Sequence, residues 1–220
     1  MKTCLLVHLL PDSKRNMFIE QPPQFIRNIY PSAFWRMDKD VRAVYLTFDD
    51  GPIPEVTPWV LDVLDRYGIK ATFFMVGDNI RKHLDEFRLV VESGNRIGNH
   101  TFNHVSGLSY DTYSYLENTD KACRMMMNTD IFRPPHGYMS PKQYAELKKR
   151  YKIIMWDLLT RDYNRKFTGE QILQKVKKYA RNGSIITFHD SVKSEENIRY
   201  ALPKTIEWLT EQEYEFKVFD

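Results

Sequence analysis

Asp49 and Asp50 stand side by side at the end of an apolar segment, residues 44–48, and directly before a Gly51-Pro52 turn. The segment is rich in β-branched and aromatic side chains, which is typical of a buried strand. Two adjacent carboxylates repel each other, so either one of them is protonated or a cation lies between them. Asp is also common in ordinary solvated turns. The pair therefore predicts either a cation site or a turn, and other residues must decide between them.

His100 and His104 are a second candidate pair, four residues apart. On a helix this spacing places both imidazoles on one face, where they can bind one metal ion. Two surface histidines near the start of a helix would have the same spacing. Joined by a strand-end carboxylate, the pair would form a metal site with positions open for water and substrate. Such a site activates water or polarises a carbonyl group.

Segments with strand and helix patterns alternate along the chain, and these elements must position the candidate residues. Strands are predicted at about residues 43–48, 71–76, 96–98, 131–132, 153–156, 184–188 and 216–219. Helices are predicted from Thr57 as N-cap to Gly68, at about 80–93, 109–128 and 140–150, from the Thr168 cap to Gly183, and at 195–211. This alternation predicts a parallel sheet, and strands that are apolar on both faces agree with it. We therefore expect an α/β fold of about seven parallel strands, either an incomplete (β/α) barrel or a doubly wound sheet.

Polar residues that could bind a metal or take part in catalysis follow the carboxyl ends of five predicted strands. They are Asp49-Asp50, residues 99–104, residues 133–137, residues 157–162, and His189-Asp190. In both candidate folds the carboxyl ends of the strands meet at one edge, where active sites lie. Scattered surface residues would not select the same end of each strand, so this convergence predicts an active site and argues against the turn interpretation of the Asp pair.

The composition indicates one domain with a large core. The chain has 220 residues, 42% of them hydrophobic, and a net charge of +3 with Lys and Arg interspersed among acids. No basic block suggests a nucleic-acid partner. No apolar run is long enough to cross a membrane. The two cysteines, Cys4 and Cys123, are not expected to form a disulfide.

Residues 1–40 lie outside the regular alternation. Residues 18–40 are rich in proline and aromatic side chains, and we expect an irregular arm packed on the domain. The apolar run at residues 5–10 is short and contains His8, and no small-residue cleavage site follows it. A secretory signal peptide is therefore not predicted, and a cytoplasmic location is favoured over export.

The motifs at the strand ends, taken together, resemble those of the polysaccharide deacetylases, the NodB homology domains of carbohydrate esterase family four. They are Thr-Phe-Asp-Asp-Gly-Pro at 47–52, His-Thr-Phe-Asn-His at 100–104, Arg-Pro-Pro-His-Gly at 133–137, and Ile-Thr-Phe-His-Asp at 186–190. Their order and rough spacing also match, and the resemblance covers residues 41–220, the expected catalytic domain. It implies a distorted, incomplete (β/α) barrel. It also implies a metal-dependent hydrolase of carbon–nitrogen bonds that removes acetyl groups from N-acetylated amino sugars or glycans.

The resemblance implies a role for each charged residue at the strand ends. Asp49 is implied as general base, His189 as general acid, Arg133 as the partner that keeps Asp49 ionised, Asp162 as the carboxylate that tunes His189, and Asp50, His100 and His104 as ligands of a divalent metal. Zinc is the expected metal, with cobalt, nickel and manganese as alternatives. A cation near Asp49 lowers its pKa and an anion near His189 raises the pKa of that group, which suits acid–base chemistry near neutral pH.

Four further positions are predicted to contact the reacting acetyl group or the sugar. His136 replaces the usual Tyr of the family, and its backbone N–H is expected to bind the oxyanion. Tyr163 replaces the usual Trp, and Thr187 replaces a Leu that commonly lines the acetyl-methyl pocket, making that pocket smaller and more polar. Trp156 ends a strand, where a pocket role and a core role are both open. With Tyr138, Trp156 and Tyr163 as the main strand-end aromatics, a short N-acetylglucosamine oligosaccharide is the expected ligand.

Three other functions compete with an N-deacetylase. A degenerate member of the family would bind carbohydrate without turnover, and an esterase would remove O-acetyl groups from glycans. A metal-dependent phosphoesterase would also use Asp and His ligands, yet no second metal set or extra basic pair accompanies them. Because every charged catalytic position is filled, an enzyme is favoured.

Overall fold

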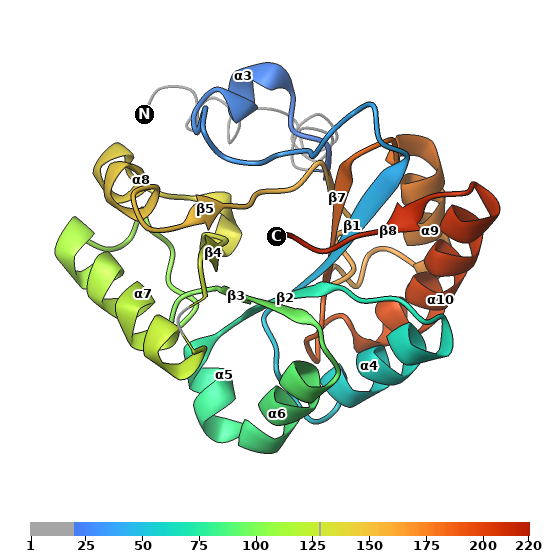
Figure 1. Cartoon of the computed structure of the whole chain (residues 1–220), viewed down its shortest axis with the longest axis horizontal. Coiled ribbons are helices and arrows are strands. Elements are labelled where there is room, and N and C mark those ends of the chain that lie inside the picture. The colour runs from blue at the N-terminus through green and yellow to red at the C-terminus, as the bar shows by residue number, and fades with distance from the viewer. Residues whose placement is uncertain (1–19, 128) are drawn as a thin grey trace.

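The computed structural model describes residues 20–127 and 129–220. Eight strands form one parallel sheet in the order β5-β4-β3-β2-β1-β7-β6, with β8 paired to β1. The strands are β1 (Ala43–Asp49), β2 (Thr72–Met75), β3 (Arg96–Asn99), β4 (Ile131–Phe132), β5 (Lys152–Ile153), β6 (Leu158–Leu159), β7 (Ser184–His189) and β8 (Glu215–Phe216). Figure 1 shows this sheet curled into an incomplete barrel, which confirms the expected fold class.

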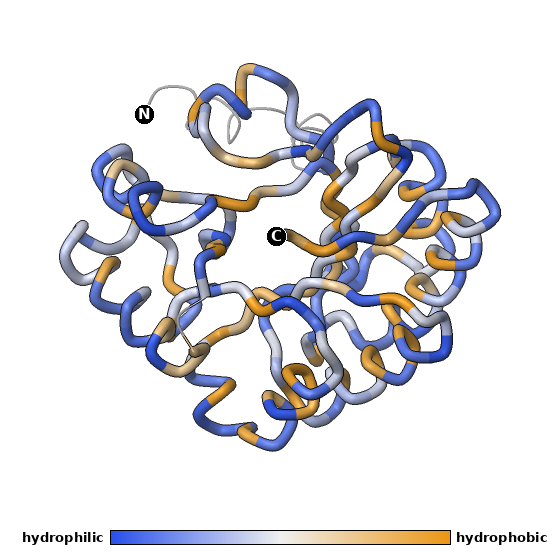
Figure 2. Tube along the Cα trace, in the orientation of Figure 1, coloured by the Kyte–Doolittle hydropathy of each residue, from blue (hydrophilic) through white to orange (hydrophobic). Residues whose placement is uncertain are grey.

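Helices surround the curled sheet (Figure 1). They are α3 (Gln24–Arg27), α4 (Thr57–Arg66), α5 (Gly77–Lys82), α6 (Leu84–Glu92), α7 (Thr112–Met125), α8 (Pro141–Leu147), α9 (Gly169–Tyr179) and α10 (Glu195–Glu211), with a 3₁₀ turn, η1, at Pro135–Gly137. Blue and orange segments alternate along these helices in Figure 2, as amphipathic helices require when one face packs on a sheet. Within the described ranges, no helix combines the length and the apolar character that crossing a membrane would need.

The central strands place the site because they are buried on both faces. Six of the seven residues of β1 are buried, and its neighbour β7 is buried throughout. The register pairs Asp49 with His189 and Asp49 with Phe74, so the carboxyl ends of these strands lie level. Phe48 stacks on Phe73 with ring centroids 5.0 Å apart, which fixes β1 against β2 from below the site.

Several predicted boundaries were wrong. The strand β6 was not predicted, because residues 157–162 were assigned to the polar segment that follows the preceding strand. The single helix expected at 80–93 is two helices, α5 and α6, separated at His83, whose backbone leaves the helical region with φ −129° and ψ 60°. The last strand ends at Phe216 rather than at residue 219. These errors lie at short elements, where local pattern is weakest.

Thr57 was predicted as the N-cap of a helix, but it is the first residue of α4. Its hydroxyl accepts the backbone N–H of Ile53 at 2.8 Å and donates to Asp190 Oδ2 at 2.7 Å. A tertiary partner therefore overrides the local capping preference. The consequence is that α4 is tied to the loop that carries Asp49 and Asp50.

The arm that precedes β1 closes the seam of the sheet by joining β5 to the start of β7. The Phe34 N–H donates to Ile153 O at 2.8 Å, and the Met155 N–H donates to Phe34 O at 2.8 Å. On the other side, the Met37 N–H donates to Gly183 O at 2.8 Å. Figure 1 shows α3 between α8 and α9. The described part of the arm, residues 20–40, thus completes the barrel wall, whereas residues 1–19 of the expected extension, Cys4 and His8 among them, lie outside the described residues.

Candidate active site

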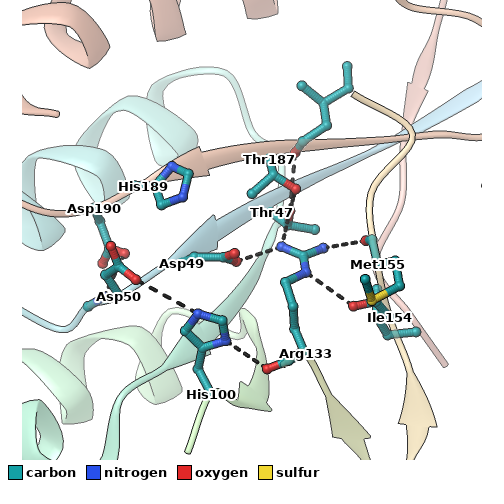
Figure 3. A network of polar contacts seen from close by, with 12 residues as sticks. Thr47, Asp49, Asp50, His100, Arg133, Ile154, Met155, Thr187, His189 and Asp190 are labelled. Atoms are coloured by element: carbon teal, nitrogen blue, oxygen red, sulfur yellow. Dashed lines mark hydrogen bonds and ion pairs between the residues drawn. The ribbon is translucent and has the colours of Figure 1, made fainter. Parts of the chain in front are cut away.

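A pocket of about 860 Å³ opens at the carboxyl ends of the strands. Its polar floor contains five of the residues singled out from the sequence, namely Asp49, Asp50, His100, His104 and His189. Most of these side chains appear together in Figure 3, where they converge from β1, β7 and the loop after β3. The structure therefore brings together groups that are separated by up to 140 positions in the chain, from Asp49 to His189.

Asp50, His100 and His104 form a group that fits a divalent metal ion. Their ligand atoms all lie within 4.8 Å of one another. Asp50 Oδ1 is 3.1 Å from His104 Nε2 and 3.8 Å from His100 Nε2. The other ring nitrogen of His100, Nδ1, is 2.8 Å from Arg133 O, so it carries the proton and donates it to that carbonyl. This bond leaves the Nε2 lone pair directed at Asp50, as an outer hydrogen bond does for a metal-binding histidine.

The charge states of this group also suit metal binding. Burial, followed by the repulsion of His104, lowers the pKa of His100 well below its usual value, so the imidazole is neutral. Burial opposes ionisation of Asp50, but the hydrogen bond from His104 and the attraction of nearby histidines, His189 foremost, together outweigh burial and hold the pKa of Asp50 below its usual range. A neutral imidazole at His100 and an ionised carboxylate at Asp50 are the forms that bind a cation.

The two histidines lie in a loop and not on a helix, the conformation in which their spacing would place both rings on one face. Residues 100–105 form a loop in which Thr101 has φ 63° and His104 has φ 54°. Asn99 Oδ1 accepts the Thr101 N–H at 2.8 Å, and Asn118 Oδ1 accepts the Phe102 N–H at 2.8 Å. These side-chain oxygens accept the backbone N–H groups of the loop, which in a helix would donate to carbonyl oxygens. The imidazoles meet because the loop turns back, with ring centroids 5.1 Å apart.

Asp49 forms a buried ion pair with Arg133, the residue expected to orient it. Arg133 Nη1 is 2.5 Å from Asp49 Oδ1 and donates to Thr47 Oγ1 at 2.8 Å. The guanidinium also donates to Ile154 O and Met155 O, at 3.2 and 2.9 Å, as Figure 3 shows. Four of its five N–H donors therefore have acceptors in the protein, three of them besides Asp49. The cation that orients the Asp49 carboxylate is thus itself held by three other hydrogen bonds.

The pKa of Asp49 differs from the sequence expectation in its direction. Burial raises the pKa of Asp49, and the attraction of Arg133 opposes this effect without cancelling it. Arg133 does lower the pKa of Asp49, as predicted, but the increase caused by desolvation is larger. A carboxyl whose pKa is raised toward neutrality accepts a proton more readily, which is what a general base requires.

His189 and Asp162 form the second titratable pair of the site. Asp162 Oδ1 is 2.7 Å from His189 Nδ1, and Asp162 Oδ2 accepts the His189 backbone N–H at 2.8 Å. Asn197 Nδ2 donates to Asp162 O at 2.8 Å, which fixes the loop that carries the acid. Burial opposes protonation of the ring, but the charge and hydrogen bond of Asp162, together with the charges of Asp50 and Asp49, outweigh burial and raise the pKa of His189 to about 9. The imidazole is therefore protonated at neutral pH with Nε2–H as its available donor.

Asp190 has a structural position that the sequence did not reveal. Its Oδ1 accepts the Gly51 N–H at 3.1 Å, and its own N–H donates to Asp49 O at 3.1 Å. A side chain at position 51 would start 1.9 Å from Asp190 Oδ2, so glycine is required there. Asp190 thus holds the Asp49–Asp50 turn from behind.

Three of the four predicted substrate residues line the pocket, and one does not. Tyr163 lies edge-on to His189 with ring centroids 4.7 Å apart, and His136 lies edge-on to His104 at the same distance. Trp156 lines the pocket as well. Thr187 was expected to line it, but its side chain is fully buried and lies 3.0 Å from Thr47 Oγ1. It sits one layer deeper on β7, where it supports Arg133 through Thr47 instead of touching the acetyl group.

His136 has a backbone conformation suited to binding an oxyanion. It has φ 59° within η1, an unusual value for a residue with a side chain. None of the backbone hydrogen bonds between described residues uses the His136 N–H as donor. The neighbouring donors are satisfied, since Gly137 N–H donates to Pro134 O at 3.0 Å. The N–H of His136 is thereby left for a ligand.

Sequence reasoning missed the part of the pocket that the arm supplies. Ile26, Ile29, Tyr30 and Trp35 all line it, from a segment that precedes the first strand. The density of proline and aromatic residues in this segment predicted packing on the domain. It did not predict which end of the barrel the arm would reach, because that depends on contacts across the seam.

A fold of this kind with paired acids, two histidines and a buried arginine at its strand ends defines a class of metal-dependent hydrolases. The family model for polysaccharide deacetylases matches residues 36–153. The chain is 32% identical to a peptidoglycan-N-acetylglucosamine deacetylase of Bacillus cereus, over 86% of this chain and 93% of that protein. It is 33% identical to the peptidoglycan-N-acetylglucosamine deacetylase PgdA of Listeria monocytogenes, where the match spans 83% of this chain but 39% of that longer protein.

Solved structures agree with the sequence relatives. The crystal structure of the Bc1960 peptidoglycan N-acetylglucosamine deacetylase superposes with a TM-score of 0.82 at 27% identity, covering 89% of this chain and 94% of that one. The chain therefore belongs to the polysaccharide deacetylase family. It is a carbohydrate deacetylase, a hydrolase with the NodB fold.

Proposed function

We propose that the protein removes the acetyl group from N-acetylglucosamine units of a glycan, using a divalent metal held by Asp50, His100 and His104. One observation carries the proposal. A base held by Arg133, a metal-binding group and an imidazole held by Asp162 all face one pocket. The relatives described above, which act on peptidoglycan N-acetylglucosamine by name, support the choice of an N-acetylated amino sugar.

The donor set supports a particular group of metals. Two imidazole nitrogens and one carboxylate oxygen suit zinc, and cobalt, nickel and manganese accept the same ligands. Three protein ligands leave positions for other molecules. When bound there, the cation would polarise the amide carbonyl and make water more acidic.

The residues of this chain divide the proton transfers between them. Asp49 accepts a proton from the attacking water, with one oxygen fixed by Arg133. The oxygen of that water forms a bond to the carbonyl carbon, and the His136 N–H is placed to donate to the carbonyl oxygen. The C–N bond breaks as His189 donates its Nε2 proton to the leaving nitrogen, while Asp162 keeps Nδ1 in place. The products are acetate and the free amino sugar.

The protonation state of His189 favours an amide over an ester as substrate. An amine is a poor leaving group unless it is protonated, whereas an alkoxide leaves more easily. A histidine with its pKa raised to about 9 carries the required proton at neutral pH. The O-acetyl glycan esterase function has less need of this arrangement.

Acetate release tests the proposal when it is combined with metal analysis. The full-length protein is loaded with zinc, cobalt or manganese and assayed on chitooligosaccharides, peptidoglycan fragments and acetylxylan. We expect metal-dependent release from the N-acetylated substrates and little from acetylxylan. Turnover that survives complete metal removal, or a preference for acetylxylan, contradicts the proposal.

A further inference from the structure

The arm that precedes β1 is hydrogen-bonded to the segment that carries His136. Tyr30 on the arm is buried and stands 109 positions before Met139 in the chain. Its hydroxyl donates to Met139 O at 2.8 Å and accepts the Met139 N–H at 2.7 Å. One buried oxygen atom therefore satisfies both backbone groups of a residue that follows His136 by only three positions.

The backbone between Met139 and His136 is short and has little freedom. The Tyr138 N–H donates to Pro135 O at 3.3 Å, which closes the η1 turn around His136. Tyr138 itself is extended, with φ −119° and ψ 128°, and leads directly to Met139. A displacement of Met139 would therefore be transmitted to the His136 N–H.

The arm supports the same turn at a second point. The Trp35 ring lies edge-on to Trp156, with ring centroids 6.1 Å apart. Trp156 in turn packs on Gly137, the residue after His136, where an added Cβ would lie 2.5 Å from Trp156 Cη2. The turn thus lies between two contacts that both originate in the arm, one at Met139 and one at Gly137.

The arm between these two contacts is itself fixed to the domain. The Ser32 N–H donates to the hydroxyl of Tyr144 on α8 at 2.8 Å, and the rings of Tyr30 and Tyr144 lie 5.1 Å apart. The hydrogen bonds of Phe34 to Ile153 and Met155 hold the next part of the arm. Tyr30 precedes residues 36–153, which the family model matches, so this support comes from a segment outside that match.

The His136 N–H requires accurate placement if it is to bind an oxyanion. A donor acts there only when it lies about 2.7–3.1 Å from the developing charge, and loss of one donor lowers kcat roughly 10²–10³-fold. His136 also has φ 59°, a conformation that costs free energy in a residue with a side chain and persists where surrounding contacts enforce it. The contacts of Met139 and Gly137 with the arm and with Trp156 are of this kind.

We propose that Tyr30 is a positioning residue for the oxyanion site. By binding both backbone groups of Met139, its hydroxyl holds η1 so that the His136 N–H is directed at the substrate carbonyl oxygen. The proposal rests on the deacetylase function proposed above, which supplies that oxygen. It extends the catalytic machinery to the arm, although Tyr30 acts through Met139 and not on the reacting atoms.

A matched pair of hydroxyl deletions tests the role of Tyr30. Tyr30→Phe keeps the ring and removes both hydrogen bonds to Met139. Tyr144→Phe is the control, because it also removes a hydroxyl bonded to the arm, but Tyr144 is bonded to Ser32 and does not line the pocket. Thermal unfolding establishes that both variants are folded at the assay temperature.

The kinetic assay uses the zinc-loaded full-length protein and acetate release from chitooligosaccharides. We expect Tyr30→Phe to lower kcat about tenfold or more while KM changes less than about twofold, because the interaction is made in the transition state. Bound zinc should be unchanged, since the metal-binding group is not involved. Tyr144→Phe should keep the wild-type kcat.

Nuclear magnetic resonance measures the position of the His136 N–H without turnover. Zinc-loaded protein labelled with ¹⁵N-histidine contains six labelled residues, and the amide signal that His136→Asn removes belongs to His136. Asn is chosen because it tolerates the left-handed conformation. We expect Tyr30→Phe to shift this signal and Tyr144→Phe to leave it in place.

The two measurements separate the failure of this proposal from the failure of the deacetylase function. If the wild type releases no acetate, the proposed function fails, and the His136 signal alone then decides the role of Tyr30. An unchanged kcat and an unmoved signal in Tyr30→Phe overturn the proposal, as do equal changes in Tyr144→Phe. A higher KM at unchanged kcat also overturns it, because the hydroxyl would then bind the substrate.

Discussion

Arg133 Nη1 lies 2.5 Å from Asp49 Oδ1, and neither the guanidinium nor its partner carboxylate is open to solvent to any large extent. Asp50 is the next residue, yet its carboxylate faces His100 and His104. Two adjacent, chemically identical side chains therefore have different surroundings. This difference is the physical basis for assigning one as the proton acceptor and the other as a metal ligand.

The ion pair should contribute strongly to stability, because breaking it leaves a buried charge without a partner. We expect Arg133→Met to lower the free energy of unfolding by about 3–5 kcal/mol. The double variant Arg133→Met with Asp49→Asn removes both charges and should recover part of this loss. Urea unfolding of the wild type, both single variants and the double variant measures the coupling. Additive losses would contradict a direct interaction.

The pKa of His189 predicts the pH above which activity should fall. Because its pKa is raised to about 9, the acid form is present at neutral pH and is lost as the pH rises through that value. The stability that His189 gains from pairing with Asp162 also decreases as the pH rises. It is complete below the pKa of histidine in the unfolded chain, roughly 6.5, and is lost as the pH rises through the pKa of His189 in the folded protein. Asp162→Asn should move the alkaline limb of the kcat profile to lower pH. An unchanged limb would exclude His189 as its origin.

The identity of the leaving group provides a separate test of His189. An amine requires a proton to leave, but the phenolate of an aryl acetate does not. His189→Ala should therefore reduce the hydrolysis of N-acetyl substrates at least tenfold more than the hydrolysis of an activated aryl acetate. Equal losses on both substrates would indicate that His189 positions the substrate.

Substrate length is predicted to matter little. The expectation was based partly on few aromatic residues at the strand ends, but Tyr30, Trp35 and Tyr110 also line the pocket. All of these aromatic side chains line the same pocket of about 860 Å³, so sugar units that extend beyond it are not expected to gain further stacking contacts. We expect kcat/KM for N-acetylglucosamine oligomers to level off by the trimer. A steep rise beyond the trimer would falsify this prediction.

The sequence predicted the position of site residues correctly where they follow a strand with a long apolar pattern. The strands β1 and β7 are long and apolar, so Asp49, Asp50 and His189 could be placed at one edge of the sheet. Short strands such as β6 lacked a pattern, and the seam closure by the arm depends on distant backbone contacts with residues 153–155 and 183.

Side-chain direction was the least predictable property. Thr187 and His189 share one face of β7, yet Thr187 is buried against Thr47 while His189 faces the pocket. The layer in which a residue lies depends on how neighbouring strands stagger, which no local pattern encodes. For the same reason the sequence did not reveal that a loop, and not a helix, brings His100 to His104.

The division of roles between Asp49 and Asp50 is tested most directly by metal analysis together with acetate release. The wild type, Asp49→Asn and Asp50→Ala are dialysed against zinc, analysed for bound metal and assayed on chitooligosaccharides. We predict that Asp49→Asn keeps the metal while its rate of acetate release falls about 100-fold or more, and that Asp50→Ala loses the metal. Loss of metal in Asp49→Asn, or equal metal content in Asp50→Ala and the wild type, would contradict the assignment.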